Sequence, residues 1–380
     1  MNNIDNKILA LYVHIPFCNK ICTYCDFFKM VAKTKYKTEY VEHLVKEIYL
    51  KVDSFSNLKT IYIGGGTPSA LPLNILDYLL FHLTRNINID KIDEFTIEAN
   101  PIDITPDFVK LLVKYNINRV SLGVQSFNNE KLKFLGREHN KEQAINAINV
   151  LKSGGISNIN VDIIYATPDD TYKIVKNDVL QAIKLKAKHL STYSLILEEK
   201  TVLYHMYLNK KFKAFDEDKE FKIYTKLRKL LKRHGYNHYE TSNYALKNYE
   251  SKHNQVYWSN NHYIGLGAGA SYYINNVRYT NAKNINDYYK GVNSGNLEYY
   301  EQTQLTETDI MQEEVILGLR LLKGLSLSHF KEKFGKDIFD VYPFISDLIN
   351  KKFLKITRDN NLIIPKSKLY LSNFVLKYFI

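Results

Sequence analysis

Short runs of β-branched and aromatic residues alternate with longer segments of helical periodicity over roughly the first 235 residues. This alternation predicts repeated βα units, which build a parallel sheet covered by helices. The predicted strands are 9–14, 60–63, 94–99, 119–124, 160–164 and 189–195. The predicted helices include 36–52 and 143–152, the second ending before Gly154 and Gly155. Six units are fewer than the eight of a closed barrel, so the pattern predicts an α/β fold with a partial, TIM-like (βα)6 barrel.

The pattern changes after this first domain, 1–235. Following a predicted helix at 216–234, Tyr, Asn and Gly dominate as far as residue 300, which predicts a β-rich connecting region at 236–304. Thr306, followed by Glu307 and Asp309, then predicts the start of a helix that ends at Gly324. Further short helices and a hairpin of 353–357 with 361–364 predict a small, mainly helical, winged-helix-like domain at 305–380.

Composition supports a folded protein with a full-sized core, since 45% of the 380 residues are hydrophobic and 24% are charged. No stretch approaches the roughly 20 apolar residues that span a bilayer. The first residues include Asp5, His14 and Pro16, which do not resemble a secretory signal. We therefore expect a cytoplasmic protein without a transmembrane segment, for which peripheral membrane contact stays open.

Lys and Arg outnumber Asp and Glu by 52 to 40, a net charge of +12 that would suit an anionic partner. The richest basic runs, at 210–213 and 226–233, lie beside acidic residues at 216–220, which favours solvated helix faces. No compact basic recognition helix accompanies the winged-helix-like end, so we expect no nucleic-acid partner.

The three cysteines of the chain, Cys18, Cys22 and Cys25, lie together just after the first predicted strand. They are too few for a disulfide framework. Three soft thiolates suit an iron–sulfur cluster in which one iron stays open to another ligand. The alternatives are a zinc site completed by His14, or three unrelated core thiols; no second cysteine pair or pair of histidines at zinc spacing follows.

Polar and glycine residues stand where the next predicted strands end. Gly64-Gly65-Gly66-Thr67-Pro68 follows the second strand, and no Gly-Lys-Ser/Thr sequence makes it a phosphate loop. Beyond it, Glu98 and Gln125 end the third and fourth strands, Arg137 follows by a short loop, and Asp162 lies in the fifth. Because the carboxyl ends of parallel strands meet at one rim, these groups predict one ligand site there, with a structural turn and ion-pair network as the alternative.

The spacing Cys18-x3-Cys22-x2-Cys25, with Tyr24 before the last cysteine, resembles the signature of the radical S-adenosylmethionine superfamily. That resemblance implies a [4Fe–4S] cluster whose open iron binds the amino and carboxylate groups of S-adenosylmethionine. One electron given to the sulfonium then releases a 5′-deoxyadenosyl radical. The residues that the resemblance assigns to S-adenosylmethionine are Tyr12, Tyr24, Gly65, Gly66, Thr67, Glu98, Gln125, Arg137 and Asp162.

Within the superfamily, the segments 12–18 and 123–127 resemble the branch of oxygen-independent coproporphyrinogen III oxidase-like proteins. The carboxyl segment, with Glu313, 318–320 and 324–325, resembles the domain appended in that branch. The oxidase type carries a fourth cysteine where this chain has Phe27, and it has a longer extension than the 17 residues before Cys18. Both departures weaken the prediction of coproporphyrinogen III decarboxylation to protoporphyrinogen IX, which stays the alternative function.

The string from His253 to Trp258, H-N-x-x-Y-W, resembles the distinguishing motif of a heme chaperone subfamily in the same branch. That resemblance implies heme binding through His253, Tyr257 and Trp258, and heme transfer to an unidentified acceptor protein. An electron donor such as flavodoxin or ferredoxin is a further implied partner. From the residues alone, the imidazole could ligate iron and the indole could cover a porphyrin, but a buried core histidine is the alternative. Enzymatic turnover stays open.

Overall fold

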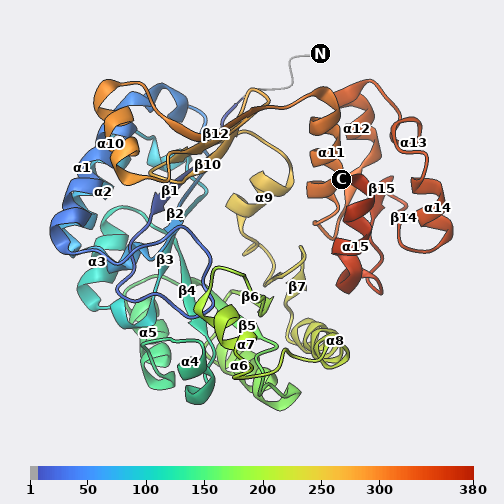
Figure 1. Ribbon diagram of the computed structural model, residues 1–380, viewed down its shortest axis with the longest axis horizontal. Coiled ribbons are helices and arrows are strands. Elements are labelled where there is room, and N and C mark those ends of the chain that lie inside the picture. Colours follow the sequence, from blue (N-terminus) through green and yellow to red (C-terminus); the bar gives the residue numbers. More distant parts are fainter. Residues whose placement is uncertain (1–6) are drawn as a thin grey trace.

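A partial barrel of parallel strands forms the body of the computed structural model, which describes residues 7–380; Asp5 lies outside the described residues (Figure 1). The described residues form one sheet of twelve strands and one of three. The central strands of the twelve-stranded sheet run parallel and in chain order. They are β1 (Ala10–Ile15), β2 (Thr60–Gly65), β3 (Glu94–Ala99), β4 (Arg119–Gln125), β5 (Asn158–Tyr165) and β6 (His189–Ser194). The six predicted strands are confirmed, each within two residues of its predicted ends.

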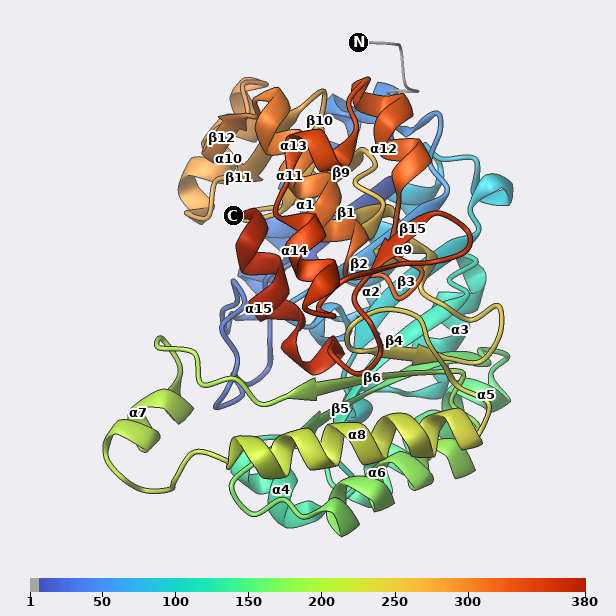
Figure 2. The same cartoon turned by 90° about the vertical axis from the view of Figure 1, so that its right-hand side faces the viewer.

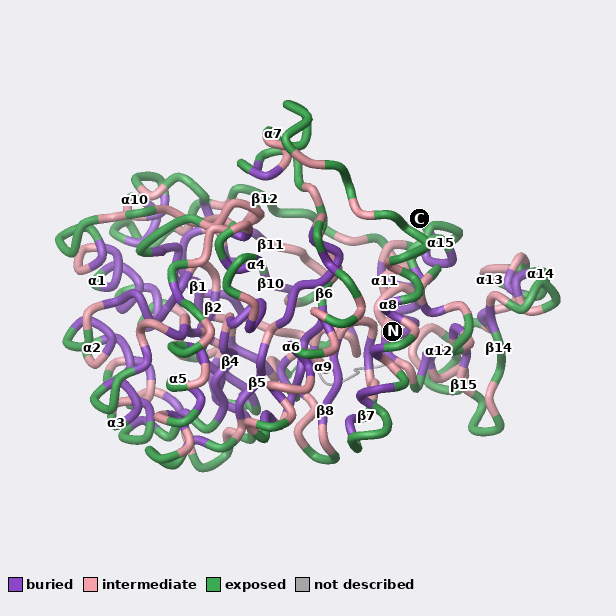
Figure 3. The backbone as a smooth tube through the Cα atoms, turned by 90° about the horizontal axis from the view of Figure 1, so that it is seen from below, coloured by how far each residue is buried: buried purple, intermediate pink, exposed green. Residues whose placement is uncertain are grey.

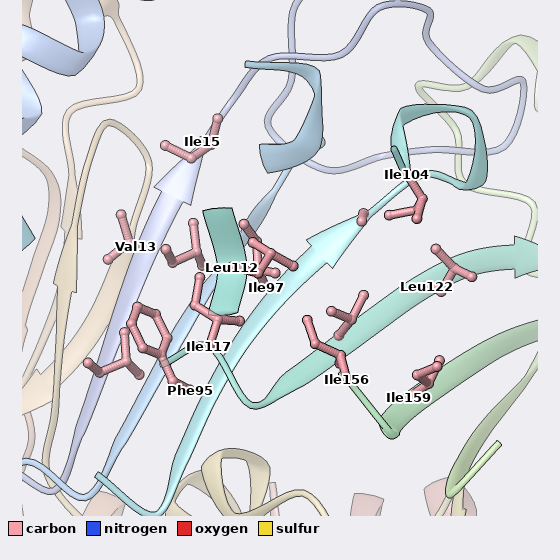
Figure 4. Close-up of a cluster of buried hydrophobic side chains, with 14 of the residues drawn as sticks. Val13, Ile15, Phe95, Ile97, Ile104, Leu112, Ile117, Leu122, Ile156 and Ile159 are labelled. Carbon is pink, nitrogen blue, oxygen red and sulfur yellow. The ribbon is translucent and has the colours of Figure 1, made fainter. Parts of the chain in front are cut away.

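Helices cover the outer face of these strands (Figure 1). They are α1 (Thr34–Leu50), α2 (Leu73–Thr84), α3 (Pro106–Lys114), α4 (Asn129–Phe134), α5 (Lys141–Ser153), α6 (Tyr172–Lys184) and α8 (Glu217–Arg233). Apolar side chains from the outer face of the strands and from these helices form the main core, as Ile97, Leu112 and Leu122 illustrate in Figure 4. Because the outer face packs the core, the inner face is left for polar side chains.

Strands from the predicted connecting region join the same sheet at both edges. Beside β1 lie β9 (Tyr263–Leu266), β10 (Ser271–Ile274), β11 (Val277–Asn281) and β12 (Tyr299–Gln304), and beside β6 lie β8 (Asn243–Ala245) and β7 (Asn237–His238). The pairings within the described residues run from β12 to β7 without joining β6 to β1, which agrees with the predicted partial barrel. The helix α10 (Ile285–Ser294) packs on α1 and also belongs to the main core. The domain limits at 235 and 304 stay a prediction.

The carboxyl-terminal segment forms a second core to the right of the barrel in Figure 1. Its elements are α11 (Glu307–Gly318), β13 (Leu325–Ser326), α12 (Leu327–Phe334), α13 (Ile338–Val341), α14 (Ile345–Asn350), β14 (Lys355–Ile356), β15 (Asn361–Ile363) and α15 (Ser372–Leu376). The helix start is confirmed, because Thr306 and Asp309 form a capping box.

The predicted end of that helix at Gly324 is wrong, since α11 ends at Gly318. The chain must turn before β13 pairs with β15, and Gly324 makes that turn with a φ of +78°. A Cβ there would lie 2.1 Å from the carbonyl oxygen of Leu362, so only glycine fits. Among the described residues, no helix is both long and apolar enough to cross a bilayer.

Candidate cofactor site in the barrel

A cavity of about 490 Å³ opens at the rim where the central strands end. Most residues that the sequence assigned to the cofactors line this cavity together: Cys18, Cys22, Tyr24, Cys25, Gly65, Gly66, Thr67, Glu98, Gln125, Arg137 and Asp162. They come from the loop after β1 and from the carboxyl halves of β2 to β5, with Arg137 following α4. The parallel order of the strands therefore brings residues 144 positions apart to one site.

The three thiols lie at the mouth of this cavity, with Cys18 buried and the other two partly exposed. The Thr67 hydroxyl donates to Cys18 Sγ at 3.4 Å, and Arg137 Nη1 donates to Cys22 Sγ at 3.2 Å. Burial raises the pKa of the Cys18 and Cys25 thiols, so an electrophilic partner such as iron is needed to hold them as thiolates. Thiols that face one cavity beside an arginine fit a cluster that takes one thiolate per iron.

Among residues 7–380, no group of three or more His, Cys, Asp or Glu side chains is arranged to surround a single metal ion. The imidazole of His14, the fourth ligand in the zinc alternative, is occupied on both nitrogens. Its Nδ1 lies 2.9 Å from the Tyr12 hydroxyl and its Nε2 lies 3.0 Å from the Phe28 carbonyl oxygen. Burial lowers the pKa of His14 to about 4, so the ring is neutral at physiological pH.

Two other elements hold the cysteine loop between Cys22 and Cys25. The backbone N–H of Thr23 donates to the Leu135 carbonyl at 3.3 Å, just after α4. The backbone N–H of Leu203, in α7 (Val202–Leu208), donates to the Thr23 carbonyl at 2.8 Å. Hydrogen bonds to the segment after α4 and to α7 therefore help to position the cysteine loop.

The glycine segment after β2 lets two backbones approach closely. Gly65 has a φ of +117°, and a Cβ there would lie 2.6 Å from the His14 ring. A Cβ on Gly66 would lie 2.9 Å from the Phe17 carbonyl oxygen, beside Cys18. Glycine is therefore required for the segment to pack against the cysteine loop. The Gly65 N–H donates to Glu98 Oε2 at 3.1 Å, which joins the second and third strands at the cavity.

The carboxylates of the cavity are held by hydrogen bonds and not by ion pairs. Glu98 Oε1 accepts from the Tyr62 hydroxyl at 2.7 Å, and burial raises the pKa of Glu98 to about 7. Asp162 Oδ1 accepts from the Asn160 amide at 2.7 Å, and burial raises the pKa of Asp162 as well. Arg137, which lies at the same rim, donates to Cys22, to the Gly123 carbonyl at 2.6 Å and to Asn100.

Four of the predicted site residues do not line the cavity. Tyr12 lies behind it, stacked on Tyr62 with ring centroids 6.2 Å apart. His253, Tyr257 and Trp258 lie in the helix α9 (Lys252–Trp258), whose first turn is bound by the Glu94 carboxylate through the Lys252 and His253 N–H groups. Only Asn254 of this helix reaches the cavity.

His253 is fully buried and its imidazole is engaged on both sides. Its Nδ1 lies 2.9 Å from Thr60 Oγ1 and its Nε2 lies 2.6 Å from the Tyr257 hydroxyl. Burial lowers the pKa of His253 to about 3, so the ring stays neutral. In this conformation the imidazole does not line the cavity, and the role of the motif in heme binding stays a prediction.

Sequence reasoning missed the polar residues that line the middle of the barrel. They are Tyr62, Arg119, Ser121, Asn160, His189 and Ser191, with Asn254 from α9. Tyr193, which was also missed, lines the cavity at an exposed position. The signal was present, because polar residues alternate with apolar ones along these strands, as in Arg119-Val-Ser-Leu-Gly-Val-Gln125. Period-two alternation sends one set of side chains to the inner face.

Comparison with known proteins agrees with this geometry. The family model of the radical SAM superfamily matches residues 12–181, and the model of the HemN C-terminal domain matches residues 305–361. The solved structure of coproporphyrinogen III oxidase (HemN) from Escherichia coli covers 98% of this chain and 90% of its own, with a TM-score of 0.85. The two chains share 23% identity, so this match shows the fold alone. Fold and site thus define a radical SAM protein with a HemN-type carboxyl-terminal domain.

Relatives with higher sequence identity show which family of radical SAM proteins the chain belongs to. The heme chaperone HemW of Lactococcus lactis is 40% identical over 91% of this chain and 90% of the relative. The HemW of Bacillus subtilis is 34% identical over 90% and 91%, and that of Escherichia coli is 37% identical over 69% of each chain. The chain belongs to the HemW family of radical SAM proteins, and membership implies a [4Fe–4S] cluster and S-adenosylmethionine.

Proposed function

We propose that this protein is a heme chaperone, which binds heme and passes it to an acceptor protein. The observation that carries the proposal is the 40% identity to a HemW heme chaperone over 91% of the chain. A match of that extent includes most of the barrel and at least part of the carboxyl-terminal segment. The proposed function therefore concerns the whole chain.

Cys18, Cys22 and Cys25 would hold the [4Fe–4S] cluster in this proposal, and S-adenosylmethionine would lie at the rim beside Gly65, Gly66 and Thr67. The cluster supplies one-electron chemistry when it is bound. Glu98 would accept a hydrogen bond from the amino group of S-adenosylmethionine, and Arg137 would neutralise charge beside Cys22. Tyr24, Gln125 and Asp162 line the same cavity, whereas Tyr12 would act through the ring of Tyr62.

The mouth of the cavity offers apolar side chains that suit the flat ring of heme. Ile21, Phe27, Tyr193 and Ile196 line the cavity and are exposed, with 72% of Phe27 and 65% of Ile196 accessible to solvent. Exposed apolar groups around a cavity mark a ligand or partner site. Phe27 stands where the oxidase type has a cysteine, and its side chain cannot bind iron. This weighs against the oxidase alternative.

The proposal includes a cytoplasmic location, since free thiols persist in a reducing compartment. It also includes an unidentified heme-acceptor protein and an electron donor such as flavodoxin or ferredoxin. His253, Tyr257 and Trp258 are proposed to contribute to heme binding through the position of α9, whose Asn254 lines the cavity.

The test uses the full chain, reconstituted anaerobically with iron, sulfide and S-adenosylmethionine. Heme is titrated and followed by its Soret band, and the loaded protein is then mixed with apomyoglobin as a generic acceptor. We expect stoichiometric heme binding and transfer of heme to the acceptor. A variant with Cys18, Cys22 and Cys25 all replaced by Ala serves as the control for the cluster. Conversion of coproporphyrinogen III to protoporphyrinogen IX, without stable heme binding, would overturn the proposal in favour of the oxidase.

A further inference from the structure

The guanidinium of Arg119 lies deep in the barrel without a counterion in contact. Arg119 is the first residue of β4, it is 2% exposed, and it lines the cavity. Within residues 7–380 its one hydrogen bond runs from Nη1 to Thr96 Oγ1 at 3.4 Å, and its Nε has no partner. No carboxylate lies within 4.0 Å of it among the ion pairs of the described residues. Burying a cation in this way is costly unless a ligand completes its surroundings.

Glu94, which does not line the cavity, lies one hydroxyl away from Arg119, since its Oε1 accepts from Thr96 Oγ1 at 3.2 Å. The two carboxylates of the cavity on which Arg119 acts are also engaged elsewhere. Glu98 accepts from Tyr62 and Gly65, and Asp162 accepts from Asn160. Arg119 acts on both only as a distant charge, which lowers their pKa values less than burial raises them. The N–H groups of the Arg119 guanidinium that make no hydrogen bond among the described residues can therefore donate to an acceptor that enters the cavity.

Position along the strand separates Arg119 from the cluster. Gln125, at the other end of β4, lies at the rim with the cysteine loop. A register shift between Leu122 and Gln125 leaves five residue steps of β5 between Asn158 and Ile163, the partners of Arg119 and Gln125, a span of about 16 Å. At the level of Arg119, Tyr62 and Thr96 are its neighbours on one side, and on the other Asn158 has a buried amide oxygen without a partner. The cavity lining at this level includes Tyr62, Arg119 and Ser121, so it is polar and carries a positive charge, while exposed apolar side chains lie at the mouth.

We propose that Arg119 is the anchor for a carboxylate group of a ligand that enters the barrel past the cluster. The planar guanidinium matches the two oxygens of a carboxylate. The inference rests on the proposed function, because heme combines an apolar ring with two propionate carboxylates, and Arg119 lines the same cavity as the exposed apolar side chains Phe27 and Ile196. The carboxylate of S-adenosylmethionine would instead bind the cluster iron, at the other end of β4, so the binding of that ligand serves as a control in the experiment.

The experiment compares Arg119→Gln with the wild-type protein, both reconstituted with the cluster. Heme and heme dimethyl ester are titrated by the Soret band, and S-adenosylmethionine is titrated by calorimetry. We expect Arg119→Gln to weaken heme binding at least tenfold, to leave the ester unchanged and to leave S-adenosylmethionine unchanged. Arg85→Gln, at an exposed position after α2, controls for the loss of one positive charge. Arg119→Lys keeps the charge without the fork, so it should lose part of the affinity and serves if the Gln variant does not fold.

Each outcome decides the inference. Equal losses for heme and its ester, or no loss for any ligand, would overturn it. A loss of S-adenosylmethionine binding as large as the loss of heme binding would also overturn it, because the change would then not be confined to a propionate contact. If wild-type protein binds no heme, the proposed function fails and the inference fails with it, whereas equal losses for heme and its ester overturn the inference alone.

Discussion

At the residue scale, the described charged side chains Glu98, Asp162 and Arg119 on the inner face of the barrel make hydrogen bonds to neutral groups and do not pair with one another. Glu98 and Asp162 are satisfied by hydroxyl, amide and backbone donors, while Arg119 has no carboxylate in contact. Separate charges in a cavity cost stability, but they leave each group available for a ligand. The protonation of Glu98, whose pKa burial raises to about 7, then affects ligand binding.

Glu98 should make S-adenosylmethionine binding depend on pH. The pKa of Glu98 is about 7 in the empty site, so its carboxyl group is mostly protonated below pH 7. Binding of S-adenosylmethionine places a positive sulfonium and an N–H donor near this group and favours the carboxylate, so below pH 7 Glu98 must lose its proton when the ligand binds. We expect the dissociation constant to rise as the pH falls from 8 to 6, by up to about tenfold per pH unit. Calorimetry at several pH values measures it.

The control for this prediction is Glu98→Gln, which cannot titrate. The amino group of the ligand also loses a proton when it binds iron, so the difference between the two proteins reports on Glu98. The slope should be steeper for the wild-type protein than for the variant. Identical slopes would show that the carboxyl group does not change its protonation on binding.

His253→Ala should lower stability more than it changes the heme spectrum. The imidazole is fully buried between Thr60 and Tyr257, so its loss leaves two buried hydroxyls without partners and a cavity. We expect a cost of about 2–4 kcal/mol in unfolding free energy, with the Soret maximum of bound heme unmoved. Thermal unfolding and absorption spectra measure both.

Asn254→Ala is the matched control, since Asn254 adjoins His253 and lines the cavity. It should change heme affinity with a smaller loss of stability. A shifted Soret maximum in His253→Ala, at unchanged stability, would instead show that α9 moves and that the imidazole ligates iron.

At the element scale, short helices hold the site in place. Figure 2 shows α7 standing away from the body of the barrel, and Figure 3 shows how much of it is exposed. Its one buried residue, Leu203, is also the residue whose N–H holds the Thr23 carbonyl in the cysteine loop. This small contact therefore couples α7 to the cluster ligands.

Leu203→Ala should make the cluster more sensitive to air. Removing the fully buried side chain leaves a cavity, which should lower the free energy of unfolding by about 2–5 kcal/mol. The loosened loop would then expose Cys22 and Cys25 to oxidants. We expect a severalfold faster loss of the cluster's visible absorption after exposure to air. Val202→Ala, 57% exposed in the same helix, should lose absorption at the wild-type rate. Equal rates for the two variants would contradict a role of α7 in holding the loop.

At the scale of the whole molecule, the described residues form two hydrophobic cores. The main core surrounds the cavity, whereas the second core joins the carboxyl-terminal helices to Tyr224 of α8. A bidentate ion pair between Arg278 of β11 and Glu313 of α11, with Nη2 and Oε2 2.6 Å apart, connects the barrel sheet to this second core. No residue of the second core lines the cavity.

Phe330→Ala should therefore destabilise the protein without removing S-adenosylmethionine binding. Phe330 is fully buried in the second core, and its truncation should cost about 3–5 kcal/mol. Thermal unfolding and calorimetric binding below the unfolding temperature test this separation. Phe374→Ala, at a side chain 47% exposed, should change stability little. Binding that weakens in step with stability would show that the two cores act as one unit.

The sequence by itself determined the local features of this protein. The spacing of Cys18, Cys22 and Cys25, the glycine segment after β2 and the six central strands all depend on residues close together in the chain. Period-two and helical patterns also determined which faces are apolar, because burial of those faces drives each element onto the core. The start of α11 followed from its capping box for the same local reason.

Only the tertiary structure decided which of these residues share one cavity. Register between strands far apart in the chain brings Tyr62, Arg119 and Asn160 to the inner face, whereas Tyr12 lies behind it. The motif at His253 left a heme ligand and a core histidine both open, and the packing of α9 against Thr60 and Glu94 buries the imidazole. Such choices depend on contacts between distant segments, and no local pattern encodes them.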